Sequence, residues 1–292
     1  MLHTLGKEYR MSADVSDVSL PQQTYTVGAL LAAQRLLRIS SLPDFLKIRP
    51  QQLGGELTAA EWAALEKGRV VIAGEVDPEL EVILRALARP DAEVRVKLEY
   101  RERLDTRMVI VRSGRLVVVA VLCGDEITID PYTDVTSAEQ IGREVAGQIA
   151  GYLFATKEPR PVRISPTLVS ATAVLSGLAG AEREQWRTSL TDAGIAADVA
   201  EVLNEMESAP MARAEVSAAL CQVNTYGDSD SVVRVVDTAL GAGMTSFTND
   251  NDGQVWLRVE PYDSRVLVNL IAGCVMGVPH SGWFTHQRHD QF

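Results

Sequence analysis

Cysteine is scarce in this sequence, and the cysteines that occur are far apart. Cys123, Cys221 and Cys274 are the only three, and none belongs to a CxxC pair. Three scattered thiols do not make the disulfide framework of a small secreted domain. They are typical of buried, small apolar side chains in a reducing compartment.

Long apolar runs are missing too. No stretch reaches the roughly 18 apolar residues that a membrane-spanning helix needs, and the N-terminus lacks the basic region and apolar core of a secretory signal. We therefore expect a cytoplasmic protein without direct membrane insertion.

Positive charge is in deficit, with 28 Lys and Arg against 39 Asp and Glu and a net charge of −11. Nucleic-acid binding depends on basic side chains that replace the counterions of phosphates, so we expect no nucleic-acid partner. The same deficit disfavours binding to an anionic membrane surface. Hydrophobic residues make up 46% of the chain, which is enough for the core of a soluble domain.

Motifs for catalysis, cofactors and metals are absent as well. No nucleophile elbow of the form Gly-x-Ser-x-Gly occurs. The acidic turn Asn249–Gly253 has Val259 where a calcium loop needs its bidentate Glu, so a hairpin turn is favoured. Cys274 and the C-terminal histidines match no compact ligand spacing, and we interpret the histidines as a solvated tail. These histidines are His280, His286 and His289.

What the sequence does contain is a run of four predicted strands over residues 92–131. The first alternates charged and apolar residues, which gives one buried and one solvated face. The next two are nearly all apolar, as in strands covered on both faces. Short loops with glycine make the four strands an antiparallel meander. The predicted strands are Glu93–Arg101, Arg107–Arg112, Arg115–Cys123 and Glu126–Asp130, the last of them stopped by Pro131. We expect a half-polar outer strand, with helices on one side of the sheet and a partner on the other.

Helix-start signals flank this meander. Capping boxes occur at Thr58–Glu61 and at Ser137–Gln140. Asp77 followed by Pro78 begins another helix, and Asp263 caps the last one. The apolar spacing of residues 26–38 predicts an amphipathic helix, while residues 44–49 read as a short strand.

The same plan recurs beyond the proline-rich segment Lys157–Pro161. Pro50, Trp62 and Pro90 have counterparts at a nearly constant spacing, namely Pro166, Trp186 and Pro210. We therefore predict an α+β fold of two quasi-symmetric halves, each a four-stranded antiparallel meander with covering helices. The predicted organisation is a flexible leader (1–19), an N-terminal half (20–156) and a C-terminal half (157–292) with strands over 214–260.

The solvated face of the first strand is the candidate binding surface. Mixed charges of this kind orient a protein partner through complementary charge. The loop Arg101–Thr106 that follows is longer and more charged than the other loops of the meander, which suggests a use. The candidate partner-binding residues are Arg95, Lys97, Glu99, Arg101, Glu102, Arg103, Leu104 and Asp105.

Several short motifs, in order along the chain, resemble the EspG family of type VII (ESX) secretion chaperones. They are Leu42-Pro43, Ile48-Arg49-Pro50, Ala60-Glu61-Trp62, Asp77-Pro78, Leu87-Ala88-Arg89-Pro90-Asp91 and Gly282-Trp283-Phe284 with Arg288. The resemblance implies a non-enzymatic protein that binds the apolar tip of the PPE subunit in a PE–PPE heterodimer. It places part of the contact on the loop at Arg101–Thr106, on the neighbouring sheet and on helices of the second half.

Two other functions stay open. A structural adaptor that forms a homodimer through its sheets, without a PPE client, would use the same strands. A metal-dependent enzyme would have to be built on Cys274 and the C-terminal histidines.

Overall fold

The structure is a computed structural model that describes residues 22–48, 56–100, 105–155, 157–222, 225–250, 252–279 and 282–288. The elements of its first part begin with strand β1 (Gln23–Thr26), helix α1 (Val27–Leu37), the 3₁₀ helix η2 (Asp44–Leu46), α2 (Ala59–Lys67), β2 (Val71–Ile72), β3 (Glu75–Val76) and α3 (Pro78–Ala88). The meander and its helix follow as β4 (Ala92–Tyr100), β5 (Thr106–Ser113), β6 (Leu116–Cys123), β7 (Glu126–Tyr132) and α4 (Ala138–Leu153).

The second part has a similar series of elements. It begins with β8 (Thr167–Ser170), α5 (Ala171–Leu178), the 3₁₀ helix η3 (Arg183–Gln185), α6 (Trp186–Asp192) and α7 (Ala197–Ser208). It continues with β9 (Ala212–Gln222), β10 (Thr225–Asp228), β11 (Val233–Thr238), β12 (Gly241–Asn249), β13 (Val255–Pro261) and α8 (Ser264–Met276).

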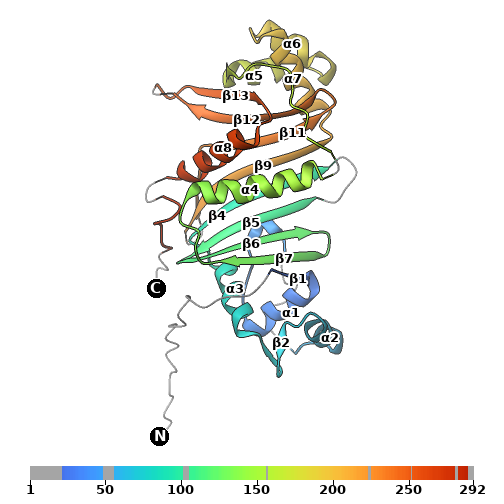
Figure 1. Ribbon diagram of the computed structural model, residues 1–292, viewed down its shortest axis with the longest axis vertical. Coiled ribbons are helices and arrows are strands. Elements are labelled where there is room, and N and C mark those ends of the chain that lie inside the picture. Colours follow the sequence, from blue (N-terminus) through green and yellow to red (C-terminus); the bar gives the residue numbers. More distant parts are fainter. Residues whose placement is uncertain are drawn as a thin grey trace.

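The two meanders join into one sheet. Within the described ranges it has eleven strands in the order β1-β7-β6-β5-β4-β9-β11-β12-β13-β8, with β10 also paired to β9. β4 and β9 pair antiparallel from Ala92 to Tyr100, so the seam lies in the middle of the sheet. Outward from the seam, each side runs through its meander and ends on the strand that precedes its first helix (Figure 1). The α+β fold is as predicted, while the division of the chain at residue 157 stays a prediction.

Helices cover the two faces of this sheet differently. On one face α4 and α8 lie side by side across the central strands (Figure 1). They close a core on the even-numbered apolar residues of β4, among them Ala92, Val94, Val96 and Leu98. Gly142 permits the close approach of these helices, because an added Cβ would lie 2.5 Å from the carbonyl oxygen of Val268.

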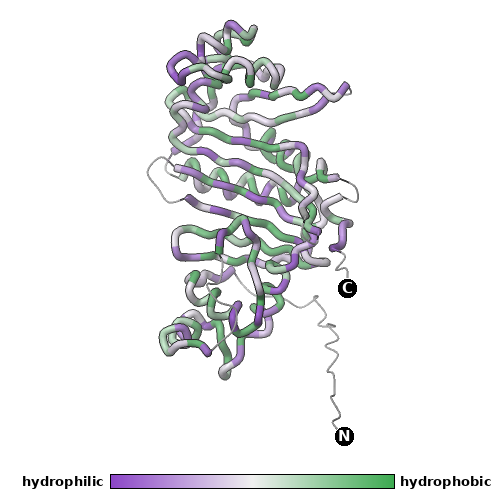
Figure 2. Tube along the Cα trace, turned by 180° about the vertical axis from the view of Figure 1, so that it is seen from behind, coloured by the Kyte–Doolittle hydropathy of each residue, from purple (hydrophilic) through white to green (hydrophobic). Residues whose placement is uncertain are grey.

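The opposite face has two separate helical layers. α1 and α3 pack on β5–β7 around Leu30, Leu84 and Val109, and we call this layer the N-terminal lobe. α5–α7 pack on β11–β13 around Leu203 and Val259, and we call them the C-terminal lobe. Figure 2 shows the central strands lying open between the two lobes. Each fully buried aliphatic side chain of these cores contributes about 1.5–3 kcal/mol relative to an exposed one.

The helix starts agree with the predicted signals. Both capping boxes form, at Thr58–Glu61 and at Ser137–Gln140. The Asp77 side chain caps α3, which has a proline in its first turn, and Asp263 caps α8. Among the described residues, no helix is both long and apolar enough to span a bilayer.

Three predictions about strands are wrong. Residues 44–48 do not form a strand, because Asp44–Leu46 is a 3₁₀ helix. Leu46 and Ile48 are both buried, and their spacing of two residues is the same as that of inward-facing residues in a strand. Pro131 does not stop β7, which continues to Tyr132. β1 pairs only with Glu126–Ile129, so no described strand needs an N–H from position 131 on that side. β4 is not an outer strand of the sheet, since β9 pairs with it along its whole length.

Candidate partner-binding surface

The open face between the two lobes carries a strip of charged side chains. The odd-numbered residues of β4 point to this face, and the register brings charged residues of three neighbouring strands beside them. We call this set the paired strip. It consists of Glu93, Arg95, Lys97, Glu99, Arg213, Glu215, Asp228 and Arg234.

Each basic side chain of the paired strip has a carboxylate partner. Arg213 donates to Glu99 at 2.9 and 2.6 Å, and Lys97 pairs with the same carboxylate. Arg234 donates to Glu215 at 2.9 Å. Because the charges pair with one another, a partner need not bring counter-charges to this surface.

Arg95 is the most heavily engaged member of the strip. Its Nε lies 2.5 Å from Glu93 Oε1, and its Nη1 lies 3.1 Å from Asp228 Oδ1. The guanidinium carbon is 4.6 Å from the centre of the Tyr226 ring. Arg95 is therefore held by β4, its own strand, and by β10.

The two glutamates at the ends of β4 differ in their electrostatics. Glu93 is only 2% exposed, and burial raises its pKa against the opposing charge of Arg95. Burial would also raise the pKa of Glu99, but hydrogen bonds from Lys97 and Arg213 outweigh it and lower that pKa. Desolvation therefore dominates the pKa of Glu93, and hydrogen bonding to basic side chains dominates the pKa of Glu99.

The structure brings together part of the predicted site. Arg95, Lys97 and Glu99 lie on the paired strip, as the alternation of β4 predicts. Asp105 is exposed directly before β5. The other predicted residues, Arg101, Glu102, Arg103 and Leu104, lie outside the described residues.

Sequence reasoning missed the members of the strip that lie on other strands. Residues 212–217 alternate apolar and polar like β4, and this signal marks Arg213 and Glu215 as facing the solvent. Nothing in the sequence indicates that they face Lys97 and Glu99, because the pairing joins segments more than a hundred residues apart.

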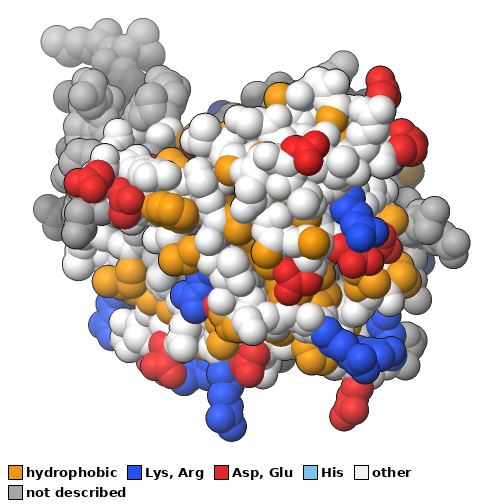
Figure 3. Space-filling model, turned by 90° about the horizontal axis from the view of Figure 1, so that it is seen from above, with side chains coloured by type: hydrophobic (Ala, Val, Ile, Leu, Met, Phe, Trp, Pro, Cys, Tyr) orange, Lys and Arg blue, Asp and Glu red, His pale blue; other side chains and the backbone are white. Residues whose placement is uncertain are grey.

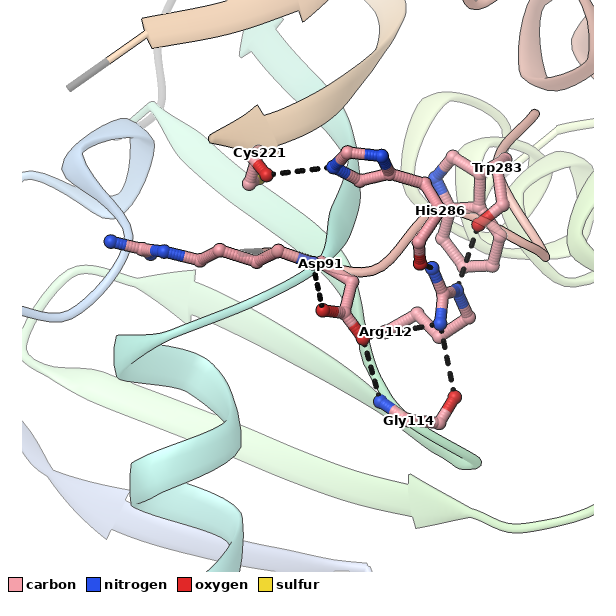
Figure 4. A network of polar contacts seen from close by, with 7 residues as sticks. Asp91, Arg112, Gly114, Cys221, Trp283 and His286 are labelled. Carbon is pink, nitrogen blue, oxygen red and sulfur yellow. Dashed lines mark hydrogen bonds and ion pairs between the residues drawn. The ribbon is translucent and has the colours of Figure 1, made fainter. Parts of the chain in front are cut away.

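A second polar network ties the C-terminal segment to the first meander (Figure 4). Arg112 is buried and donates to the carbonyl oxygens of Trp283 at 2.7 Å and Gly114 at 3.1 Å, and also to that of His286. Asp91 accepts hydrogen bonds from the backbone of Gly114 at 2.8 Å and pairs with Arg112. These donors and acceptors bond to one another, so we assign the network a structural role.

The residues considered for a metal site are partly described. A ring nitrogen of His286 lies 3.0 Å from the carbonyl oxygen of Cys221, and the Cys274 thiol donates to the carbonyl oxygen of Ser231 at 3.0 Å. His280 and His289 lie outside the described residues. In the part of the chain that is described, no group of three or more His, Cys, Asp or Glu side chains could hold a metal ion.

The end of the molecule formed by the C-terminal lobe has a mixed surface. Figure 3 shows apolar, acidic and basic side chains interspersed on it, without a broad region of one sign. Leu175 on α5 is one of the exposed apolar side chains. Such a surface offers apolar contact together with polar edges, as protein interfaces do.

Comparison with known proteins gives a consistent result. The model of the EspG family matches residues 26–273. Two relatives, the ESX-5 secretion-associated proteins EspG5 of Mycobacterium marinum and of Mycobacterium tuberculosis, are each 24% identical over 302 residues, which cover 91% of this chain and 96% of each relative. A solved structure of the Mycobacterium tuberculosis type VII secretion system chaperone EspG5, in complex with the PE25–PPE41 dimer, has the same fold, with a TM-score of 0.76 and 21% identity over 91% of this chain and 100% of that one. Because the family model spans most of the sequence, this chain belongs to the EspG family.

Proposed function

We propose that this chain is a cytoplasmic chaperone of type VII (ESX) secretion that binds the PPE subunit of a PE–PPE heterodimer. It would act by binding and not as an enzyme. The observation that carries the proposal is the fold shared with a chaperone that is solved in complex with a PE25–PPE41 dimer. The open sheet face between two helical lobes supports it, since such a face can receive a partner.

The physical reason for such a chaperone is the exposed apolar tip of the PPE subunit. Large apolar patches on a soluble protein drive aggregation, so a protein that covers the tip keeps the client soluble. A specific interface buries about 1,200–2,000 Å² in total. Handover to the secretion system requires dissociation, which favours a Kd of about 1 μM to 1 nM over tighter binding.

We place the contact on the paired strip and on the loop between β4 and β5. The residues of this contact are Arg95, Lys97, Glu99, Arg101, Glu102, Arg103, Leu104 and Asp105. Apolar contacts would supply most of the affinity, and the charged loop would set the orientation of the client.

Co-expression with PE–PPE pairs tests the proposal. We expect one pair to co-purify with the chain and to elute with it as a complex of defined mass in light scattering. If the chain elutes only as a monomer or a homodimer beside every pair, it is not a PPE chaperone, and a homodimer would favour the adaptor function.

Charge reversal then tests the position of the contact. Arg101→Glu with Arg103→Glu should weaken client binding and leave the melting temperature unchanged. Arg143→Glu is the matched control, because Arg143 is an exposed arginine on α4, on the other face of the sheet. A lower melting temperature for the loop variant would instead assign Arg101 and Arg103 a structural role.

A further inference from the structure

Tyr226 is unusual among the exposed side chains of this protein. Half of it (50%) is accessible to solvent, and it is the only aromatic among the large apolar side chains exposed within the described residues. It lies on β10 opposite Cys221 of β9, which places its ring on the same face as the paired strip. Exposed aromatic side chains on a binding face are frequent anchors of protein interfaces.

The ring of Tyr226 is held in place before any partner binds. The guanidinium of Arg95 lies over it, 4.6 Å from the ring centre. Arg95 is in turn fixed by Glu93 at 2.5 Å and by Asp228 at 3.1 Å. Because the ring is already ordered, contact with it costs less conformational entropy than contact with a free side chain.

The surroundings of the ring favour an apolar group over an acidic one. The guanidinium of Arg95 already pairs with two carboxylates, so it is not available to an acidic group of a partner. No described residue hydrogen-bonds the Tyr226 hydroxyl. Partial burial, with a smaller contribution from the Glu93 charge, raises the pKa of Tyr226, so the phenol stays neutral. A half-exposed tyrosine with a neutral phenol offers apolar contact area and one polar edge.

The position of Tyr226 separates it from the charged loop. Asp228 and Tyr226 lie near the first residues of β4, while the loop follows Tyr100 at the end of that strand. A client bound on the paired strip would therefore contact the loop after Tyr100 at one end of β4 and the Tyr226 ring at the other end.

We propose that Tyr226, backed by Arg95, is an anchor that receives an apolar side chain from the helical tip of the PPE subunit. This inference rests on the function proposed above and assigns one residue of that contact. Arg95 is its positioning residue, since it acts by holding the ring.

Titration calorimetry of the full chain with PE–PPE dimers tests the anchor. The probes are the PE25–PPE41 dimer and any pair that co-purifies with the chain. Tyr226→Ala should weaken binding at least about tenfold, whereas Tyr226→Phe, which keeps the ring, should stay within about threefold of the wild type. The melting temperature of both variants should equal that of the wild type.

Met276→Ala is the matched control. Met276 is 65% exposed at the end of α8, on the other face of the sheet, and its removal should leave the affinity unchanged. A wild-type chain that binds no PE–PPE dimer would overturn the proposed function and the anchor together. Equal affinities of the wild type and Tyr226→Ala would overturn the anchor alone. An equal loss in Tyr226→Phe, or a lowered melting temperature in Tyr226→Ala, would also overturn it.

Discussion

Arg213 on β9 donates two hydrogen bonds to one carboxylate oxygen of Glu99 on β4, at 2.9 Å from Nε and 2.6 Å from Nη2. The two residues are register partners across the seam where the meanders join. Both side chains are partly solvated, with 25% of Glu99 and 32% of Arg213 exposed. Solvent therefore screens the pair, and its net contribution to stability is modest.

A double-mutant cycle should measure this pair directly. For Glu99→Ala and Arg213→Ala we expect a coupling free energy of about 0.5–1 kcal/mol from urea unfolding, decreasing at high salt. The Glu139–Arg143 pair on α4 is the control, because both of its side chains are more exposed and its coupling should be smaller. A coupling of zero at Glu99–Arg213 would show that the seam does not depend on this contact.

Glu93 should make stability depend on pH in an unusual direction. Its pKa in the folded protein is raised above the ordinary value of 4.5, so the folded state holds this proton more tightly than the unfolded state. The resulting stabilisation is complete below the ordinary pKa and is lost as pH rises through the folded pKa. We expect the unfolding free energy of the wild type to fall relative to Glu93→Gln as pH rises from 4.5.

Glu99 provides the opposite case on the same strand. Its pKa is lowered, so its stabilisation is present above the ordinary value and is lost on acidification through the folded pKa. Relative to Glu99→Gln, the wild type should therefore lose stability as pH falls below 4.5. Parallel pH profiles for the two substitutions would contradict the assigned environments.

Arg112 should hold the C-terminal segment in place. Its side chain is 5% exposed, and Arg112→Met would remove the ion-pair partner of Asp91 and a hydrogen-bond donor to three carbonyl oxygens. We expect a loss of about 3–5 kcal/mol of stability and faster amide hydrogen exchange over residues 282–288. Arg112→Lys keeps the positive charge but lacks the planar guanidinium with its several N–H donors, so it should restore only part of the lost stability.

The control for this experiment is Arg143→Met, which removes an exposed arginine and should change neither stability nor exchange. If Arg112→Met left the exchange of residues 282–288 unchanged, other contacts, such as the burial of Trp283, would be holding the segment.

Gly142 should be intolerant of even one methyl group. A Cβ there would lie 2.5 Å from the carbonyl oxygen of Val268, so Gly142→Ala must push α4 away from α8. We expect a loss of about 1–3 kcal/mol in thermal or urea unfolding. Gly147→Ala on the same helix meets nothing within 4 Å and should stabilise the protein by about 0.5–1 kcal/mol. Equal effects of the two substitutions would refute the close packing.

Much of the fold can be predicted from local patterns in the sequence. The alternation in β4 and the apolar runs of β5 and β6 predict their strands, and the capping residues Thr58 and Ser137 mark the starts of their helices. These signals are local, because each depends on side chains within one turn or one strand.

The rest depends on contacts between distant segments. β1, β8 and β10 have four residues each, which is too short for a clear period, so nothing predicted them. The alternation in β4 predicts a strand with one solvated face, but it does not indicate whether another strand lies beside it. The pairing with β9 is therefore seen only in the structure. In the candidate site, Arg95, Lys97 and Glu99 were predictable from alternation, whereas Asp228 and Tyr226 reach them only through the sheet.

The seam between β4 and β9 has a mechanical consequence. The two strands are hydrogen-bonded partners from Ala92 to Tyr100, and α4 and α8 brace the back of the same strands. Hinge bending at the seam would have to break this ladder, so the two halves of the sheet are joined as one unit. The continuous sheet therefore presents the strands between the two lobes as a single preformed surface, and its shape does not depend on a linker between domains.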